Sequence, residues 1–141
     1  ESVTYINDSK ATNTASTAPA LAAYPPRDGT PRIHWIVGGL AKEEGLGECE
    51  AHLGNVAAAY TVGEAGPRFA DALEGKVPRV ERCELISEAV QRAQASAKPG
   101  DVVLFSPACA SFDQFASFEA RGDAFKAAVA RLNQPAVMEG A

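Results

Sequence analysis

Three short segments of this sequence concentrate side chains that could bind an anionic ligand. The first, residues 7–13 (NDSKATN), combines a carboxylate, an ammonium group and several hydroxyl and amide groups. In such a segment Asp8 can accept a hydrogen bond from a sugar hydroxyl, while Lys10 and Thr12 can bind an anion. The same residues also suit a polar turn that caps a following helix, because Asn and Thr cap helices well. Residue types alone leave both interpretations open.

The second segment is the pair Gly38-Gly39 with Lys42 shortly after it. Paired glycines allow positive φ angles and a close approach of the backbone to a ligand or to another segment. The pattern is neither the dinucleotide fingerprint G-x-G-x-x-G nor a P-loop, which requires G-x-x-x-x-G-K-[ST]. It is equally typical of a turn that ends a strand and is followed by a solvated lysine.

The third segment, residues 106–115 (SPACASFDQF), is rich in small residues. Small side chains let backbone amides or a helix N-terminus face a carboxylate. A nucleophilic Ser111 or Cys109 is the competing functional interpretation. The segment lacks the G-x-S-x-G elbow of serine nucleophiles. A nucleophile also needs a neighbouring base, and the two histidines fall elsewhere, His34 in an expected strand and His52 in an expected helix.

The elements that must position these segments follow from the hydrophobic pattern. Short β-branched or apolar runs predict strands at about 2–6, 32–37, 57–62, 80–83 and 101–105. Helical spacing and turn residues predict helices at about 17–24, with Pro19 in the first turn, and at 46–56, 67–73, 85–97 and 122–132.

This alternation predicts right-handed βαβ units, and therefore an α/β, Rossmann-like three-layer domain with a mostly parallel sheet of about five to six strands. Ligands of such sheets bind outside the carboxyl ends of the strands. We therefore expect Lys10, Lys42 and Ser111 to converge at one edge of the sheet.

Composition narrows the class of protein. The chain has 141 residues, enough for one domain with its own core, and a net charge of −5. That charge argues against nucleic acid as a partner, because no basic patch is available for phosphates. No run approaches the roughly 20 apolar residues that span a bilayer, so we expect no membrane partner and a cytoplasmic location. The three cysteines and two histidines lack metal-ligand spacing, so no metal site is expected and the cysteines are expected as thiols.

The first and third segments together resemble one family. Residues 7–13, and residues 106–118 (SPACASFDQFASF) followed by Glu119, Arg121 and Gly122, are similar to the C-terminal domain of Mur ligases, in the branch that adds D-glutamate to UDP-N-acetylmuramoyl-L-alanine. The second segment falls where that family carries a glycine pair and a lysine.

The resemblance extends to about residue 132, which implies a domain at 1–132 that binds D-glutamate and closes over ATP. We expect residues 133–141 to form a flexible tail. A free-standing Rossmann-like module for a nucleotide or a small anion is the alternative function.

The resemblance implies an ATP-dependent ligase of three domains, which works through an acyl-phosphate intermediate. Its missing N-terminal and central domains would be partners of this chain. The N-terminal domain would bind the UDP moiety, and the central domain would carry the P-loop and the Mg²⁺ ligands. The Mg²⁺ ligands are then expected outside this chain, and the chain alone is expected to be inactive.

Residue roles follow from the resemblance by position. Asp8 and Lys10 are implied as ATP-binding residues, Asp8 at the ribose and Lys10, the catalytic residue, at the transferring phosphate. The residues implied to bind the D-glutamate carboxylates are Thr12, Lys42 and Ser111, and the backbone amide of Phe112 and the side chain of Phe118 are implied to complete the pocket.

Overall fold

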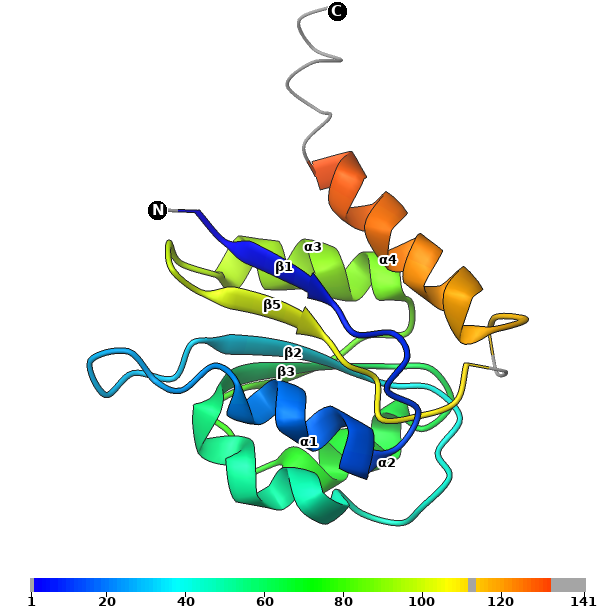
Figure 1. The fold of residues 1–141 in the computed structure, drawn as a ribbon, viewed down its shortest axis with the longest axis horizontal. Coiled ribbons are helices and arrows are strands. Elements are labelled where there is room, and N and C mark those ends of the chain that lie inside the picture. The colour runs from blue at the N-terminus through cyan, green and yellow to red at the C-terminus, as the bar shows by residue number, and fades with distance from the viewer. Residues whose placement is uncertain (1, 112–113, 133–141) are drawn as a thin grey trace, which may run out of the picture.

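Five parallel strands form one sheet in the computed structural model of the chain, in the order β1-β5-β2-β3-β4 (Figure 1). The structure describes residues 2–111 and 114–132. The strands are β1 (Thr4–Asn7), β2 (Ile33–Gly38), β3 (Val56–Val62), β4 (Val80–Arg82) and β5 (Val102–Phe105). The expected α/β fold with a parallel sheet is confirmed. The expected tail at 133–141 lies outside the described residues.

Helices cover both faces of the sheet and make three layers (Figure 1). One face packs against α1 (Thr14–Ala22), the 3₁₀ helix η1 (Gly47–Asn55) and α2 (Gly66–Leu73). The other face packs against α3 (Ile86–Ser96) and α4 (Phe118–Leu132). The central strand β2 is buried along its whole length, as expected for a strand covered on both faces.

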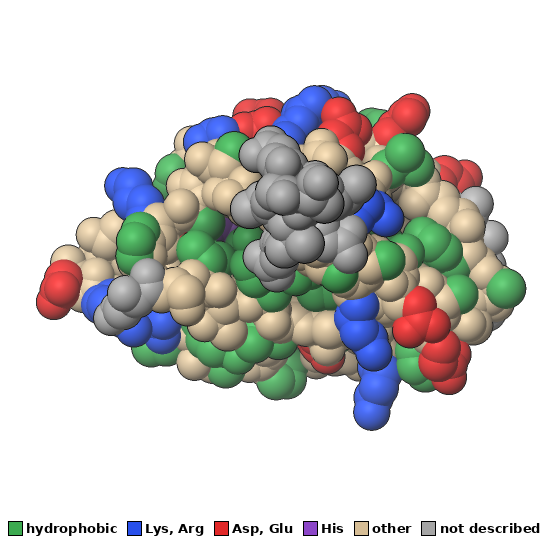
Figure 2. All heavy atoms as spheres, turned by 90° about the horizontal axis from the view of Figure 1, so that it is seen from above, with side chains coloured by type: hydrophobic (Ala, Val, Ile, Leu, Met, Phe, Trp, Pro, Cys, Tyr) green, Lys and Arg blue, Asp and Glu red, His purple; other side chains and the backbone are tan. Residues whose placement is uncertain are grey.

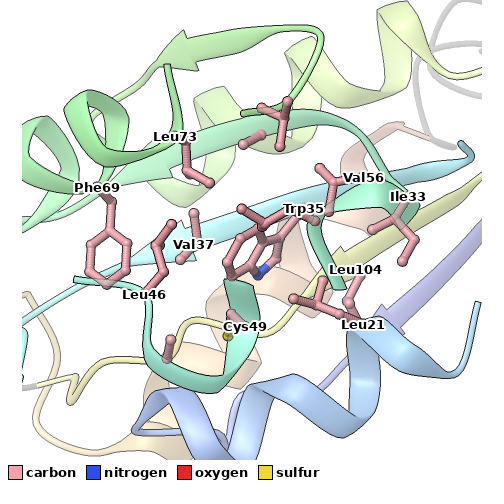
Figure 3. Close-up of a cluster of buried hydrophobic side chains, with 14 of the residues drawn as sticks. Leu21, Ile33, Trp35, Val37, Leu46, Cys49, Val56, Phe69, Leu73 and Leu104 are labelled. Carbon is pink, nitrogen blue, oxygen red and sulfur yellow. The ribbon is translucent and has the colours of Figure 1, made fainter. Parts of the chain in front are cut away.

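Alternation of side chains along the strands divides the core in two. Trp35 and Leu104 lie in the core shared with α1, η1 and α2, where Figure 3 shows them beside Leu21 and Leu73. The next residue along β5, Phe105, points to the opposite face and stacks on Phe125 of α4, with ring centroids 5.0 Å apart. Because successive residues of a strand face opposite sides, each strand contributes to both cores.

Two helices begin well before the residue that the sequence predicted for their start. α1 begins at Thr14 rather than at residue 17, because the Asn13 side chain caps it by accepting a hydrogen bond from the Ser16 amide at 2.8 Å. Pro19 therefore lies inside the helix and not in its first turn. α4 begins at Phe118, four residues before the expected 122, after Ser117 accepts a hydrogen bond from the Ala120 amide at 3.1 Å.

The surface carries charges of both signs. Figure 2, which views the molecule from the top of Figure 1, shows Lys and Arg side chains interspersed with Asp and Glu. Within residues 2–111 and 114–132, no helix has the length and the hydrophobicity that crossing a membrane requires.

Gly38, the last residue of β2, has a φ of +133°, a conformation that side chains rarely adopt. A Cβ atom at this position would collide with the backbone carbonyl oxygen of Val62 on β3. Neither atom can yield easily, because both belong to paired strands. Glycine is therefore required where the chain leaves β2 for the segment that contains Lys42.

We expect Gly38→Ala to lower the free energy of unfolding by about 2 kcal/mol or more, from backbone strain and steric overlap together. The matched control is Gly54→Ala in η1, where a Cβ would meet no atom within 4 Å and φ is ordinary. This second change should stay within about 1 kcal/mol of the parent chain. Urea denaturation of both variants measures the difference, and equal effects would contradict the constraint at Gly38.

Candidate functional site

The carboxyl ends of three neighbouring strands, β1, β5 and β2, lie side by side at one edge of the sheet (Figure 1). The three segments singled out in the sequence leave the sheet at these ends, at Asp8, Ser106 and Gly39. The expected convergence of the segments at one edge is confirmed. Parallel pairing imposes this arrangement, because all carboxyl ends then face the same way.

Backbone hydrogen bonds join the three segments to one another. Leu40 and Ala110 exchange two N–H···O bonds of 2.9 Å, which ties the second segment to the third. The Ala108 amide donates to the carbonyl of Ala11 at 3.0 Å, which ties the third segment to the first. The three loops therefore form one connected surface.

Asp8 is held by a short chain of hydroxyl groups. The Ser106 hydroxyl donates to Asp8 Oδ2 at 2.7 Å and lies 2.9 Å from the hydroxyl of Thr17 on α1. Ser106 and Thr17 are buried, whereas Asp8 is half-buried. The carboxylate is thus oriented by the neutral Ser106 hydroxyl, and it remains at the surface of the edge.

Lys42 and Thr12, both candidates for binding the same substrate, lie together. Lys42 Nζ donates a long hydrogen bond of 3.4 Å to Thr12 Oγ1. Lys42 is exposed and Thr12 is half-buried, so an ammonium group and a hydroxyl face solvent side by side. An ionised carboxylate could accept hydrogen bonds from both groups at this place.

Lys10 and Phe118 meet at a second place on the same edge. They line one surface hollow of about 310 Å³ between the first segment and the start of α4. The other lining residues are Asn7, Ser9, Glu119, Gly122, Asp123 and Lys126. Thr12 and Lys42 do not line this hollow. The candidate residues therefore fall into two neighbouring groups.

Ser111 is placed differently from the exposed candidates. Its side chain is buried, and its carbonyl oxygen accepts hydrogen bonds from the amides of Gln114 at 3.2 Å and Phe115 at 2.9 Å. Phe112, whose backbone amide was implicated, lies outside the described residues. The roles of Ser111 and Phe112 in ligand binding stay predictions.

The capping interpretation of residues 7–13 also describes part of the segment. Asn13 caps α1, while Asp8, Lys10 and Thr12 stand before the cap. The turn is closed by the Ala11 amide, which donates to the Asp8 carbonyl at 3.0 Å. One end of the segment thus builds the helix, and the other end faces the site.

Arg121, for which the sequence predicted no role, lies beneath the site. Arg121 is 2% exposed, and its Nη2 donates to the Ser9 carbonyl at 3.0 Å. The guanidinium also lies over the Phe105 ring, 5.9 Å from its centroid, and a side chain at Gly39 would meet it. Arg121 thus bonds the first segment and lies against the last residue of β5 and the glycine that follows β2. The available signal was helical spacing, because Phe118, Arg121 and Phe125 share one face of α4.

Neither a metal centre nor an activated nucleophile is assembled from the described residues. In the ranges 2–111 and 114–132, no three His, Cys, Asp or Glu residues are grouped so that they could hold a metal ion. Cys109 and Ser111 are buried. His34 stands near the opposite, amino end of β2, where its ring bonds Tyr60 and Asp101 at 2.9 Å each.

Comparisons with known proteins show the family to which the chain belongs. The family model of the Mur ligase, glutamate ligase domain matches residues 1–109. The chain therefore belongs to the Mur ligase glutamate ligase domain family. The match ends before Ser111, Phe112 and Phe118, so it includes the first two segments and only the start of the third.

Individual relatives share more of the chain. It is 59% identical over 130 residues to a UDP-N-acetylmuramoylalanine–D-glutamate ligase of Novosphingobium aromaticivorans, covering 92% of this chain and 28% of the relative. It is 54% identical over 128 residues to one of Sphingopyxis alaskensis (91% and 29%), and 49% identical over 140 residues to one of Brucella abortus (96% and 28%). The chain spans less than a third of the length of these relatives.

The buried cysteines allow a direct test of the nucleophile alternative. Burial raises the pKa of Cys49 to about 12 and that of Cys83 to about 11, and Cys109 is fully buried. A raised pKa keeps the thiol neutral until the pH approaches that value, and the neutral thiol is a poor nucleophile. We expect iodoacetamide at mildly alkaline pH to label none of the three in the native chain and all three in denaturant. Rapid native labelling of Cys109 would revive the nucleophile interpretation.

Proposed function

We propose that this chain is the C-terminal domain of an ATP-dependent ligase that adds D-glutamate to UDP-N-acetylmuramoyl-L-alanine in peptidoglycan precursor synthesis. The observation that supports it best is the Lys42–Thr12 pair beside the Asp8–Lys10 segment, at the carboxyl edge of a Mur ligase glutamate ligase domain. A small dicarboxylate requires cationic and hydroxyl donors, and an ATP phosphate requires a further cation. This edge offers both.

In the proposed reaction, ATP phosphorylates the alanyl carboxylate to an acyl phosphate. The amine of D-glutamate then attacks the acyl carbon, and phosphate leaves from the tetrahedral intermediate. Lys10 neutralises charge on the transferring phosphate, and Asp8 accepts hydrogen bonds from the ATP ribose. Phosphoryl transfer depends chiefly on positioning and electrostatics, which suits an exposed lysine on a fixed loop.

D-Glutamate binding is assigned to the remaining candidates. Lys42 and Thr12 bind a carboxylate from the side of the second segment, and Ser111, the Phe112 amide and Phe118 complete the pocket. Hydrogen bonds to an ionised group contribute roughly 1.5–3 kcal/mol each, so the Lys42 ammonium is the largest single contribution expected.

The remaining parts of the proposed enzyme lie outside this chain. The sequence contains no P-loop. We propose that the N-terminal and central domains of a longer polypeptide supply the P-loop and the Mg²⁺ ligands, because the chain spans less than a third of the length of its ligase relatives. The reaction is proposed to occur in the cytoplasm. That the chain spans 28% or 29% of ligase relatives supports this proposal over a free-standing anion-binding module.

The function is tested by amino-acid selectivity of the full-length protein. With UDP-N-acetylmuramoyl-L-alanine and ATP, we expect phosphate release that depends on D-glutamate. L-Glutamate, L-lysine and diaminopimelate should give little release, because each places its charges differently from the two carboxylates and the amine of D-glutamate. Equal activity with diaminopimelate, or no amino-acid dependence, would contradict the proposed substrate.

The two exposed lysines should have separable effects in the full-length ligase. Lys10→Ala should lower kcat by about a hundredfold or more with a small change in the KM for D-glutamate, because it removes charge stabilisation from the transferring phosphate. Lys42→Ala should raise that KM about ten- to a hundredfold with a smaller effect on kcat. Steady-state kinetics measure both, and wild-type values in both variants would refute the loop assignments.

A further inference from the structure

Lys42 lies in a loop whose own backbone does not fix its position. Residues 41–46 form no helix or strand between β2 and η1. The segment is fixed at its beginning by the Leu40–Ala110 hydrogen bonds, which precede Lys42. Lys42 itself is exposed, and its contact with Thr12 is long. The position of Lys42 therefore depends on a contact made by the chain after this residue.

Glu43 provides that contact and so tethers the loop. Its Oε2 accepts a hydrogen bond from the Thr14 amide at 2.8 Å, and its Oε1 accepts one from the Thr14 hydroxyl at 2.8 Å. Thr14 is buried and is the first residue of α1, two positions after Thr12. Glu43 therefore joins the residue next to Lys42 to the short stretch of chain that contains Thr12.

Electrostatic interactions strengthen the hydrogen bonds between Glu43 and Thr14. The Thr14 amide lies at the N-terminus of α1, where unpaired amides and the helix dipole favour a negative charge. The hydrogen bond from the Thr14 backbone, followed by the one from its side chain, lowers the pKa of Glu43, and neighbouring Lys42 lowers it further. Glu43 is therefore ionised at neutral pH, the state that accepts both hydrogen bonds.

A second residue, Gly47, which follows Glu43 in the chain, also packs against Thr14. Gly47, at the start of η1, has a φ of +52°, and a Cβ at this position would collide with the Thr14 hydroxyl. Thr14 is thus enclosed by the Glu43 carboxylate and the Gly47 backbone. The anchor of the tether is a fixed, buried group rather than a mobile surface side chain.

We propose that Glu43 is a positioning residue for D-glutamate binding: its two hydrogen bonds to Thr14 hold Lys42 beside Thr12, so that both donors face one carboxylate. This proposal rests on the proposed function, in which Lys42 and Thr12 bind the substrate. Glu43 itself makes no contact with substrate in this account. It acts through the position of Lys42.

The test uses the full-length ligase and compares three substitutions. Glu43→Ala removes both hydrogen bonds and should raise the KM for D-glutamate about tenfold, with kcat and the KM for ATP changed less than about twofold. Glu43→Gln should largely rescue the KM, because the amide can accept from the Thr14 N–H and interact with its hydroxyl. Glu44→Ala, at the adjacent exposed carboxylate, is the matched control and should leave the KM unchanged.

A double-mutant cycle separates positioning from a general loss of structure. In a Lys42→Ala background, Glu43→Ala should change the KM for D-glutamate by less than about twofold, because its effect passes through Lys42. Fully additive effects would overturn the positioning role, as would a wild-type KM in Glu43→Ala when Lys42→Ala raises it. If Lys42→Ala leaves the KM unchanged, the proposed binding role of Lys42 fails, and the role of Glu43 fails with it.

Discussion

The parallel adjacency of β1, β5 and β2 is the constraint on which the site depends. These strands are not consecutive in the chain, since β5 enters the sheet between the first two. Its insertion places the loop after residue 105 between the loops after residues 7 and 38. Segments almost a hundred residues apart therefore meet at one edge, and the Leu40–Ala110 bonds join two of them directly.

Beneath these loops, buried polar groups give the edge a fixed base. Arg121 contacts the Ser9 carbonyl and the Phe105 ring, and the indole of Trp35 donates to the Ser106 carbonyl at 2.8 Å. Burying a guanidinium is costly unless it is hydrogen-bonded, so these contacts fix the guanidinium and the loops together. The exposed groups, Lys10 and Lys42, stand on this base. Exposed lysines on a fixed, buried base suit a binding site, because rigid loops lose less conformational entropy when a ligand binds.

Much of the fold could be predicted from the sequence. The DVVLF run at 101–105 predicted a central strand, because a continuous apolar run suits burial on both faces, and β5 is buried throughout. Helix starts were less predictable. Asn13 and Ser117 cap α1 and α4, but short polar residues recur through both loops, and only the three-dimensional path selects which one caps.

The site was predictable in position but not in its internal contacts. Strand-end placement predicted that Lys10, Lys42 and Ser111 would lie at one edge, and their segments do. Pairing of Lys42 with Thr12, and of Glu43 with Thr14, depends on the path of a loop without regular structure, which no periodicity encodes. The burial of Ser111 likewise follows from tertiary packing rather than from residue type.

The central claim is that the loops at this edge together bind one small diacid, and a crystal structure of the full-length protein with D-glutamate tests it most directly. The account predicts a D-glutamate carboxylate within hydrogen-bonding distance of both Lys42 Nζ and Thr12 Oγ1. D-Glutamate bound instead at the opposite end of the sheet, in the hollow lined by His34, Arg79 and Lys98, would contradict it.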